Sequence, residues 1–176
     1  MDMTDDSKKY YYFAYGSNLD VDAVKRWWQG KGENPGDYGP AVLYPGMLPD
    51  YRLSFNYHSK GVWNAGAANI MRSNGDRVYG LVMHISEKER DIIWTKEGVP
   101  SGAYYELSVP VFSYPSEEHY HKALTCKVMA DREEPDLQLP ASEYMKILLT
   151  AADRYRFPQD YRAYLRSIPT LTPRTS

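Results

Sequence analysis

The sequence has a single cysteine, Cys126, so the chain cannot form an internal disulfide. Positive charge is not in excess, because 21 Lys and Arg stand against 23 Asp and Glu, and the net charge of −2 argues against binding of nucleic acid or an acidic membrane. No run approaches the roughly 18 apolar residues of a membrane span, and no apolar segment precedes Tyr10 as a secretory signal would. These absences predict a cytoplasmic protein in a reducing compartment, with neither nucleic acid nor a membrane as partner.

What the sequence does contain is typical of one globular domain. Its 176 residues are 43% hydrophobic and 25% charged, and no internal repeat or shift in composition divides them. We expect a single domain over residues 10–168, with flexible tails at 1–9 and 169–176. The 17 tyrosines against 4 phenylalanines indicate that the aromatic surface is mostly tipped with hydroxyl groups.

Local signals predict where the helices begin and end. Ser17 or Asn18 can cap a helix that follows the first β-rich run. Ser86 and Glu89 have the spacing of a capping box, which predicts a second helix running to about residue 96 and ended by Gly98. Two further helices are expected, one capped by Ser142 and one opened by Pro158.

The strands are expected between these helices, in an order that favours a mixed α+β (mixed α/β) fold. Alternating or β-rich runs predict strands at 10–15, 41–44, 51–56, 65–71, 77–85, 104–114 and 120–129. The sequence Ser73-Asn74-Gly75-Asp76 is typical of a hairpin turn, and Gly80 indicates a bulge or a close neighbour. The order lacks the regular βαβ alternation of a doubly wound fold.

The first candidate site is the segment Tyr15-Gly16-Ser17-Asn18-Leu19. A strand that runs into a glycine turn and then a helix start exposes several backbone N–H groups in one direction, and such a nest can hold a carboxylate or an oxyanion. The alternative is a plain strand-to-helix turn with a cap.

Glu97 is the second candidate. A carboxylate at a helix C-terminus opposes the helix dipole, and Trp94, Val99 and Tyr104 could shield it from water. Both effects favour a carboxyl group that can accept and release a proton near neutral pH. The alternative is a solvated glutamate paired with Lys96 or a nearby arginine.

Other chemically active side chains point less clearly to a site. His119 and His121 share a strand face but lack a third ligand, so no metal site is expected, and His84 fits a structural role. Nothing near Cys126 marks it as a nucleophile. A set of tyrosines could line a pocket for an amino-acid-like ligand or be half-buried strand aromatics: Tyr15, Tyr79, Tyr104, Tyr105 and Tyr144.

Together, several segments resemble the γ-glutamylcyclotransferase family. They appear in the family's order over residues 10–168, nearly the whole chain. The matching segments are Phe13–Leu19, Gly66–Ile70, Gly75–Val82 and Glu97–Tyr104, with weaker matches at Thr125-Cys126 and Ser142–Tyr144.

The resemblance implies a fold and a reaction. The fold is a small mixed, partly closed β-barrel with flanking helices. The reaction is a lyase reaction, related to acyl transfer and to glutathione metabolism, in which the α-amine of a γ-glutamyl amide attacks its own γ-carbonyl. It gives 5-oxoproline and releases an amino acid or amine. The expected partner is therefore a small-molecule γ-glutamyl substrate, and a homodimer is an open alternative to a monomer.

The resemblance also implies roles for particular residues. Glu97 is the general base and acid, and the loop Tyr15, Gly16, Ser17, Asn18 and Leu19 binds the glutamyl part together with Tyr104 and Tyr144. No cofactor, metal or covalent intermediate is required. Val128 and Met129 stand where some relatives have a tyrosine, which favours larger apolar leaving groups.

Two alternatives stay open. The same chemistry could remove a γ-glutamyl group from a biosynthetic amine or a thiol conjugate. The scaffold could instead be a non-catalytic module that binds a ligand without turnover.

Overall fold

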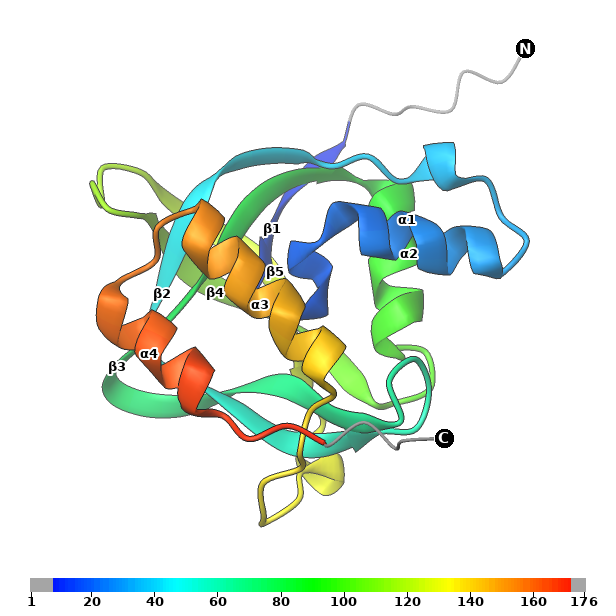
Figure 1. Cartoon of the computed structure of the whole chain (residues 1–176). Helices are drawn as coiled ribbons and strands as arrows, with labels where there is room; N and C mark the ends of the chain where they lie inside the picture. The colour runs from blue at the N-terminus through cyan, green and yellow to red at the C-terminus, as the bar shows by residue number, and fades with distance from the viewer. Residues whose placement is uncertain (1–7, 172–176) are drawn as a thin grey trace.

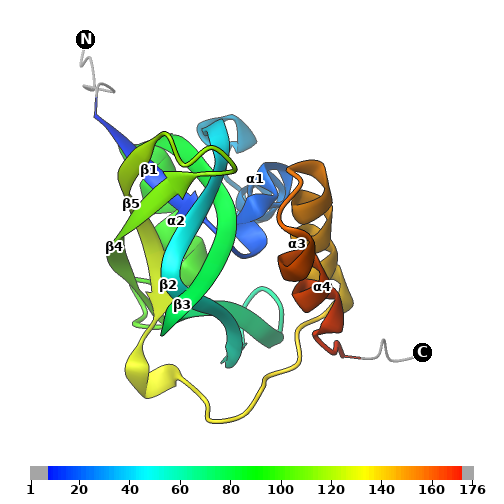
Figure 2. The same ribbon diagram turned by 90° about the vertical axis from the view of Figure 1, so that its left-hand side faces the viewer.

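The computed structural model describes residues 8–171, which form a five-stranded closed barrel with four α-helices around it (Figure 1). Figure 2 shows α1, α3 and α4 gathered on one side of the barrel. The strands are β1 (Lys9–Ala14), β2 (Ala41–Ser59), β3 (Ala65–Ser86), β4 (Tyr104–Ser113) and β5 (Tyr120–Val128). The helices are α1 (Val21–Gly30), α2 (Glu87–Glu97), α3 (Ser142–Arg154) and α4 (Gln159–Ser167).

The barrel closes through a parallel contact between its first and last strands. The strand order is β1-β3-β2-β4-β5, and Tyr12 of β1 pairs with Leu124 of β5 in parallel orientation, whereas the other pairings are antiparallel. The hydroxyl of Thr125 donates to the carbonyl of Phe13 at 2.8 Å across this seam. The predicted mixed fold is confirmed, and the barrel is closed rather than partly closed.

A long hairpin of β2 and β3 forms half of the barrel, and here the prediction of several short strands was wrong. Residues 41–59 are one strand, interrupted by register shifts. The expected turn at 73–76 is a bulge opposite Asp50, because Tyr51 pairs with Arg72 while Pro49 pairs with Arg77. Both halves of β3 therefore pair with β2 and not with each other. The tip of this hairpin, residues 60–64, reaches the cavity described below.

The second helix follows its sequence signals, and the first and third differ by a few residues. The Ser86 hydroxyl accepts from Glu89 N and the Glu89 carboxylate accepts from Ser86 N, so the capping box is confirmed, and Gly98 ends α2 at φ 74°. Helix α1 is instead capped by Asp20, because Ser17 and Asn18 lie in a separate 3-10 turn, Ser17–Leu19. Helix α3 starts after Ala141, so Ser142 is its first residue rather than its cap.

The barrel interior is apolar and closely packed. Phe13, Val82 and Val111 are fully buried there and surround Gly46. Gly80 has the close neighbour that its position indicated, since a Cβ there would lie 2.1 Å from the carbonyl oxygen of Ala14. Strands β1 and β3 therefore approach each other at a distance that only glycine permits.

The domain bounds 10–168 stay a prediction, and hydrogen-bonded backbone reaches slightly beyond them. Most of the expected tails, residues 1–9 and 169–176, lie outside the described residues. Within them, Lys9 already pairs with Ser86, and Leu171 N donates to the carbonyl of Pro140 at 2.9 Å. The ordered chain therefore extends past 10–168 at both ends. Across residues 8–171, no helix is long and apolar enough to cross a membrane.

Candidate active site

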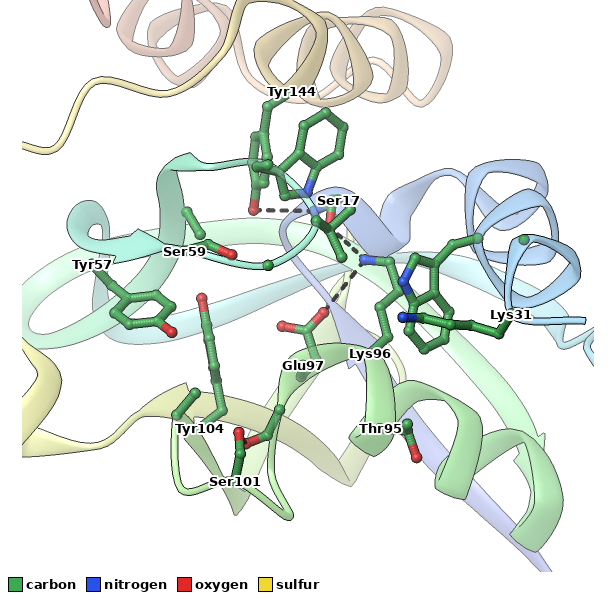
Figure 3. A pocket seen from close by; sticks show the side chains of 18 residues that line it. Ser17, Lys31, Tyr57, Ser59, Thr95, Lys96, Glu97, Ser101, Tyr104 and Tyr144 are labelled. Carbon is green, nitrogen blue, oxygen red and sulfur yellow. Dashed lines mark hydrogen bonds and ion pairs between the residues drawn. The ribbon is translucent and has the colours of Figure 1, made fainter.

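A cavity of about 680 Å³ opens where the end of α2 meets the loop after β1 and the tip of the β2–β3 hairpin (Figure 3). This volume is in the range of small-molecule sites. Its walls mix tyrosines, tryptophans and a few charged or hydroxyl groups. They are Ser17, Trp27, Gly30, Lys31, Tyr57, Ser59, Gly61, Val62, Trp63, Ala67, Thr95, Lys96, Glu97, Gly98, Ser101, Ala103, Tyr104 and Tyr144.

Glu97 lies in this cavity because it is the last residue of α2 and the left-handed Gly98 turns the chain away immediately after it. Its side chain is 17% exposed. The amide nitrogen of Asn18 donates to Oε1 at 2.9 Å. The other carboxylate oxygen points away from Lys96, on the side of Tyr104 (Figure 3). One oxygen is thus held and the other is left for a ligand.

The shielding of Glu97 differs from the expectation. Trp94 does not line the cavity, and its indole N–H donates to Glu106 at 2.9 Å. Val99 does not line it either, whereas Tyr104 does. The carboxylate is therefore enclosed by groups that come from other elements, above all by the loop after β1.

Lys96 is a buried member of the site that sequence reasoning treated only as the partner of a solvated glutamate. Its side chain is 4% exposed, and its ammonium lies 3.7 Å from Glu97 Oε1. It donates to the hydroxyl of Ser17 and to Oδ1 of Asn18, each at 2.9 Å. Burial lowers the pKa of Lys96, and the charge of Glu97 opposes that shift. No periodic signal could have revealed this burial, since Lys96 sits in the last turn of a polar helix.

Two of the predicted pocket tyrosines are held by one residue, Ala68 of β3. The Tyr144 hydroxyl accepts from Ala68 N at 3.1 Å and from Ser17 N at 3.3 Å. The Tyr104 hydroxyl donates to the carbonyl of Ala68 at 2.8 Å. Burial raises the pKa of both phenols, so both are neutral near pH 7. The small residues around position 68 allow the two rings to approach the strand.

The predicted loop lies beside Glu97 but mostly behind the main cavity. Tyr15, Gly16 and Asn18 line a small void of about 10 Å³ that shares Ser17, Glu97 and Tyr144 with the main cavity. A Cβ at Gly16 would lie 2.7 Å from the Tyr144 hydroxyl, so glycine is needed for the close approach.

Two loop residues, Tyr15 and Leu19, make contacts that stabilise the fold. The Tyr15 hydroxyl donates to the carbonyl of Cys126 at 2.6 Å. Leu19 lines neither cavity and belongs to the buried core.

The outer wall of the cavity is apolar and was not found from the sequence. Trp27 comes from α1, whereas Val62 and Trp63 come from the hairpin tip, and Val62 is 45% exposed. Lys31 lies beside them, with its ammonium 5.8 Å from the Trp27 ring. Val128 and Met129, which were expected on the leaving-group side, do not line the cavity. Val128 is fully buried, because its position on β5 directs it into the core.

The remaining chemically active residues lie elsewhere. Among residues 8–171, no group of three or more His, Cys, Asp or Glu side chains is arranged to hold a metal ion. His84 and His121 both pack against Tyr11, and burial lowers the pKa of His121. Burial raises the pKa of the Cys126 thiol.

Two members of the tyrosine set are likewise not part of this site. Tyr79 borders a separate cavity near α4, where its ring packs against Tyr161. Tyr105 is exposed on β4 and does not line the main cavity.

Comparisons with known proteins agree on one family. Residues 77–165 match the AIG2-like family. A human protein named γ-glutamylcyclotransferase is 30% identical over 169 residues, covering 93% of this chain and 80% of the human protein. Its bovine counterpart is 29% identical over 167 residues, with the same shares covered. A solved structure of a γ-glutamyl cyclotransferase superimposes with a TM-score of 0.78 at 25% identity, over 96% of this chain and 93% of that one.

The hydroxyl of Tyr144 holds two buried backbone N–H groups, which predicts its contribution to stability. Replacing Tyr144 with phenylalanine leaves both N–H donors without an acceptor, and each such loss costs about 1–3 kcal/mol of folding free energy. We expect Tyr144→Phe to lower the free energy of unfolding by about 2 kcal/mol or more in urea denaturation. Tyr120→Phe, whose side chain is 56% exposed, is the control and should change it by less than about 0.5 kcal/mol. Equal values for the two variants would contradict this role.

Proposed function

This chain belongs to the AIG2-like family and is an enzyme of the γ-glutamylcyclotransferase kind; from that premise we propose that it cyclises a γ-glutamyl amide to 5-oxoproline and releases an amine or amino acid. The observation that carries the proposal is Glu97, with one carboxylate oxygen held by Asn18 and the other facing the cavity. The proposal includes the substrate class, the product and the role of Glu97.

Glu97 acts first as a base. The α-amine of the substrate is an ammonium at neutral pH and has no lone pair for attack. Proton transfer to the free oxygen of Glu97 gives the neutral amine, whose nitrogen then forms a bond to the γ-carbon within the same molecule. Proximity is built into the substrate, because the attack closes a five-membered ring. No protein nucleophile is needed, and the buried Cys126 is not one.

Hydrogen-bond donors beside Glu97 stabilise the charge that then develops on the γ-carbonyl oxygen. The loop Gly16–Asn18 lines the small void that Glu97 also lines, and it contributes the backbone N–H groups of Gly16 and Asn18, since that of Ser17 donates to the Tyr144 hydroxyl. The Tyr144 hydroxyl accepts two backbone N–H bonds, which leaves its own proton available to a ligand. Fixed donors of this kind act without reorganisation during the reaction.

Glu97 acts next as an acid. When the C–N bond of the tetrahedral intermediate breaks, the electron pair goes to the leaving nitrogen, and the proton on Glu97 passes to that nitrogen. The carboxylate then takes the second proton from the ring nitrogen and passes it to the released amine, which leaves as its ammonium. The carboxylate is regenerated, and the products are 5-oxoproline and the released amine. The neutral phenols of Tyr104 and Tyr144 position the glutamyl part by hydrogen bonds.

The apolar wall favours one class of leaving group. With the glutamyl part at the free oxygen of Glu97, the leaving group extends toward Trp27, Val62 and Trp63. This wall supports a large apolar leaving residue, and the Lys31 ammonium at the same side suits the carboxylate of an amino acid. The preference for apolar conjugates thus rests on the tryptophans and not on Val128 and Met129.

Two alternatives differ from this proposal in substrate or in outcome. Removal of a γ-glutamyl group from a biosynthetic or thiol conjugate uses the same residues. Only a comparison of several substrates would distinguish this function from the proposed one. A non-catalytic module would bind the ligand without turnover, and the free oxygen of Glu97 in the cavity argues against it. A cytoplasmic location, a link to glutathione metabolism and a homodimer stay predictions.

Replacing Glu97 with glutamine should abolish turnover, because the amide keeps the shape but cannot accept the proton. Since one residue serves both transfers, we expect kcat to fall by at least about 10³-fold while substrate binding by calorimetry persists. The control is Glu118→Gln on the exposed β4–β5 turn, which should retain wild-type kcat. If Glu97→Gln kept more than about a tenth of kcat, Glu97 would have no part in the mechanism.

Acylation of the substrate's α-amine should block the reaction completely, because that amine is the proposed nucleophile. The assay compares γ-glutamyl-phenylalanine with its Nα-acetyl derivative and detects products by mass spectrometry. Release of N-acetylglutamate would indicate attack by water instead and would overturn the cyclisation proposal.

The apolar wall predicts that kcat/KM rises along the series γ-glutamyl-glycine, -alanine, -valine and -phenylalanine. Each methylene buried against the wall adds about 0.8 kcal/mol, or roughly fourfold. Trp63→Ala should flatten the series.

A matched pair of exposed valines serves as control for this series. Val62→Ala should weaken the preference, whereas Val42→Ala should not, since Val42 lies on β2 outside the cavity. A wild-type series that is flat or falls with size would refute the assigned role of the wall.

A further inference from the structure

The buried Lys96 has a set of contacts that the proposed proton transfers do not use. Its ammonium has three N–H donors, and three oxygens surround it: Ser17 Oγ, Asn18 Oδ1 and Glu97 Oε1. Each donor thus has a polar neighbour, and the side chain is 4% exposed. This is the arrangement of a protonated lysine held in one orientation.

The contact with Asn18 sets the orientation of that amide. Because Oδ1 accepts from Lys96, the amide nitrogen faces the other way, where it donates to Glu97 Oε1 at 2.9 Å and to the Tyr12 hydroxyl at 3.0 Å. A flipped amide would turn its oxygen toward the carboxylate. Lys96 therefore fixes the donor that holds Oε1 and leaves the second oxygen of Glu97 free.

We propose that Lys96 is a positioning residue that keeps Glu97 ionised and turned toward the substrate, and that it thereby sets the acidic limit of the enzyme's pH range. This inference rests on the proposed function, in which Glu97 is the base. Lys96 keeps its own proton throughout, while the transferred proton passes from the substrate ammonium to Glu97 and then to the leaving nitrogen.

The charges around Glu97 support this role. The other titratable groups whose charge interacts with it come from β1, β2, β4 and β5, from two loops and from α3: Tyr12, Tyr15, Tyr38, Tyr57, Tyr104, Cys126 and Tyr144. Burial raises the pKa of every one of them, so they are uncharged near pH 7. The other cation in the cavity lining, Lys31, lies beside the Trp27 ring, whereas Lys96 forms the ion pair with the carboxylate.

The direction of the effect follows from Coulomb attraction. A cation within about 4–6 Å favours the ionised form of a carboxyl group. At 3.7 Å from Oε1, the Lys96 ammonium therefore favours the carboxylate of Glu97 over its neutral acid. The same ammonium disfavours a second cation nearby and so assists loss of the proton from the substrate's α-ammonium.

The experiment records kcat/KM against pH for wild type, Lys96→Met, Lys96→Arg and the control Lys122→Met, which removes an exposed lysine of β5. In Lys96→Met, the fall of kcat/KM at acidic pH should begin at a higher pH than in wild type. The ratio of wild-type to variant kcat/KM should therefore increase by about tenfold as the pH is lowered through this range. Lys96→Arg should restore the wild-type pH dependence, and Lys122→Met should overlay wild type.

A lysine that only anchors the loop would give a different result. Lys96→Met would then lose activity by the same factor at every pH, which would overturn the inference. Thermal unfolding checks that each variant folds. If Lys96→Met does not fold, Lys96→Gln replaces it in the same measurement.

A second measurement does not depend on turnover. Carbon-13 NMR titration of the Glu97 carboxyl in the free protein should show ionisation at higher pH in Lys96→Met than in wild type. Overlaid titrations would overturn the inference even in an active enzyme. A wild type that cyclises no γ-glutamyl amide, but whose carboxyl titration shifts as expected, would refute the proposed function and leave the effect of Lys96 on Glu97 standing.

Discussion

The hydrogen bond from Asn18 to Glu97 joins segments 79 positions apart, and the geometry of the site depends on it. Both segments start from one place, because Lys9 of β1 pairs with Ser86, the N-cap of α2. From there β1 extends by about 17 Å and α2 by about 15 Å, so the loop after the strand and the end of the helix meet. An insertion in either element would separate Asn18 from Glu97.

Charge burial is the second constraint on this site, and it follows from the first. A buried ion pair gains little net stability, because desolvation of both ions offsets their attraction. The loop after β1 reduces that cost by supplying Ser17 Oγ and both ends of the Asn18 amide to the two charges. The pair is thus tolerated where the loop and helix meet, and removal of the Glu97 carboxylate would leave the buried Lys96 charge without its counter-ion.

The sequence identified the parts of the site that depend on local chemistry. The capping box at Ser86, the left-handed Gly98 and the glycine turn at Gly16 each follow from short-range rules, and together they position Glu97 and its loop. Contacts between distant segments could not be read in this way. The burial of Lys96 depends on Ser17 and Asn18, and the apolar wall depends on how the hairpin tip lies against α1. The residues 73–76 also have the local sequence of a turn. Only the pairing of the flanking residues with β2 shows that they form a bulge.

One carboxylate suffices for the proposed reaction because of where the two nitrogens lie. In the tetrahedral intermediate of a cyclisation, the attacking and the leaving nitrogen are bonded to the same carbon. A single oxygen can therefore reach both in turn. Glu97 fits this requirement, since Oε1 is fixed by Asn18 and only the second oxygen is free to exchange a proton. Holding the carboxylate rigid is then no hindrance to its double role, because neither transfer requires the group to turn.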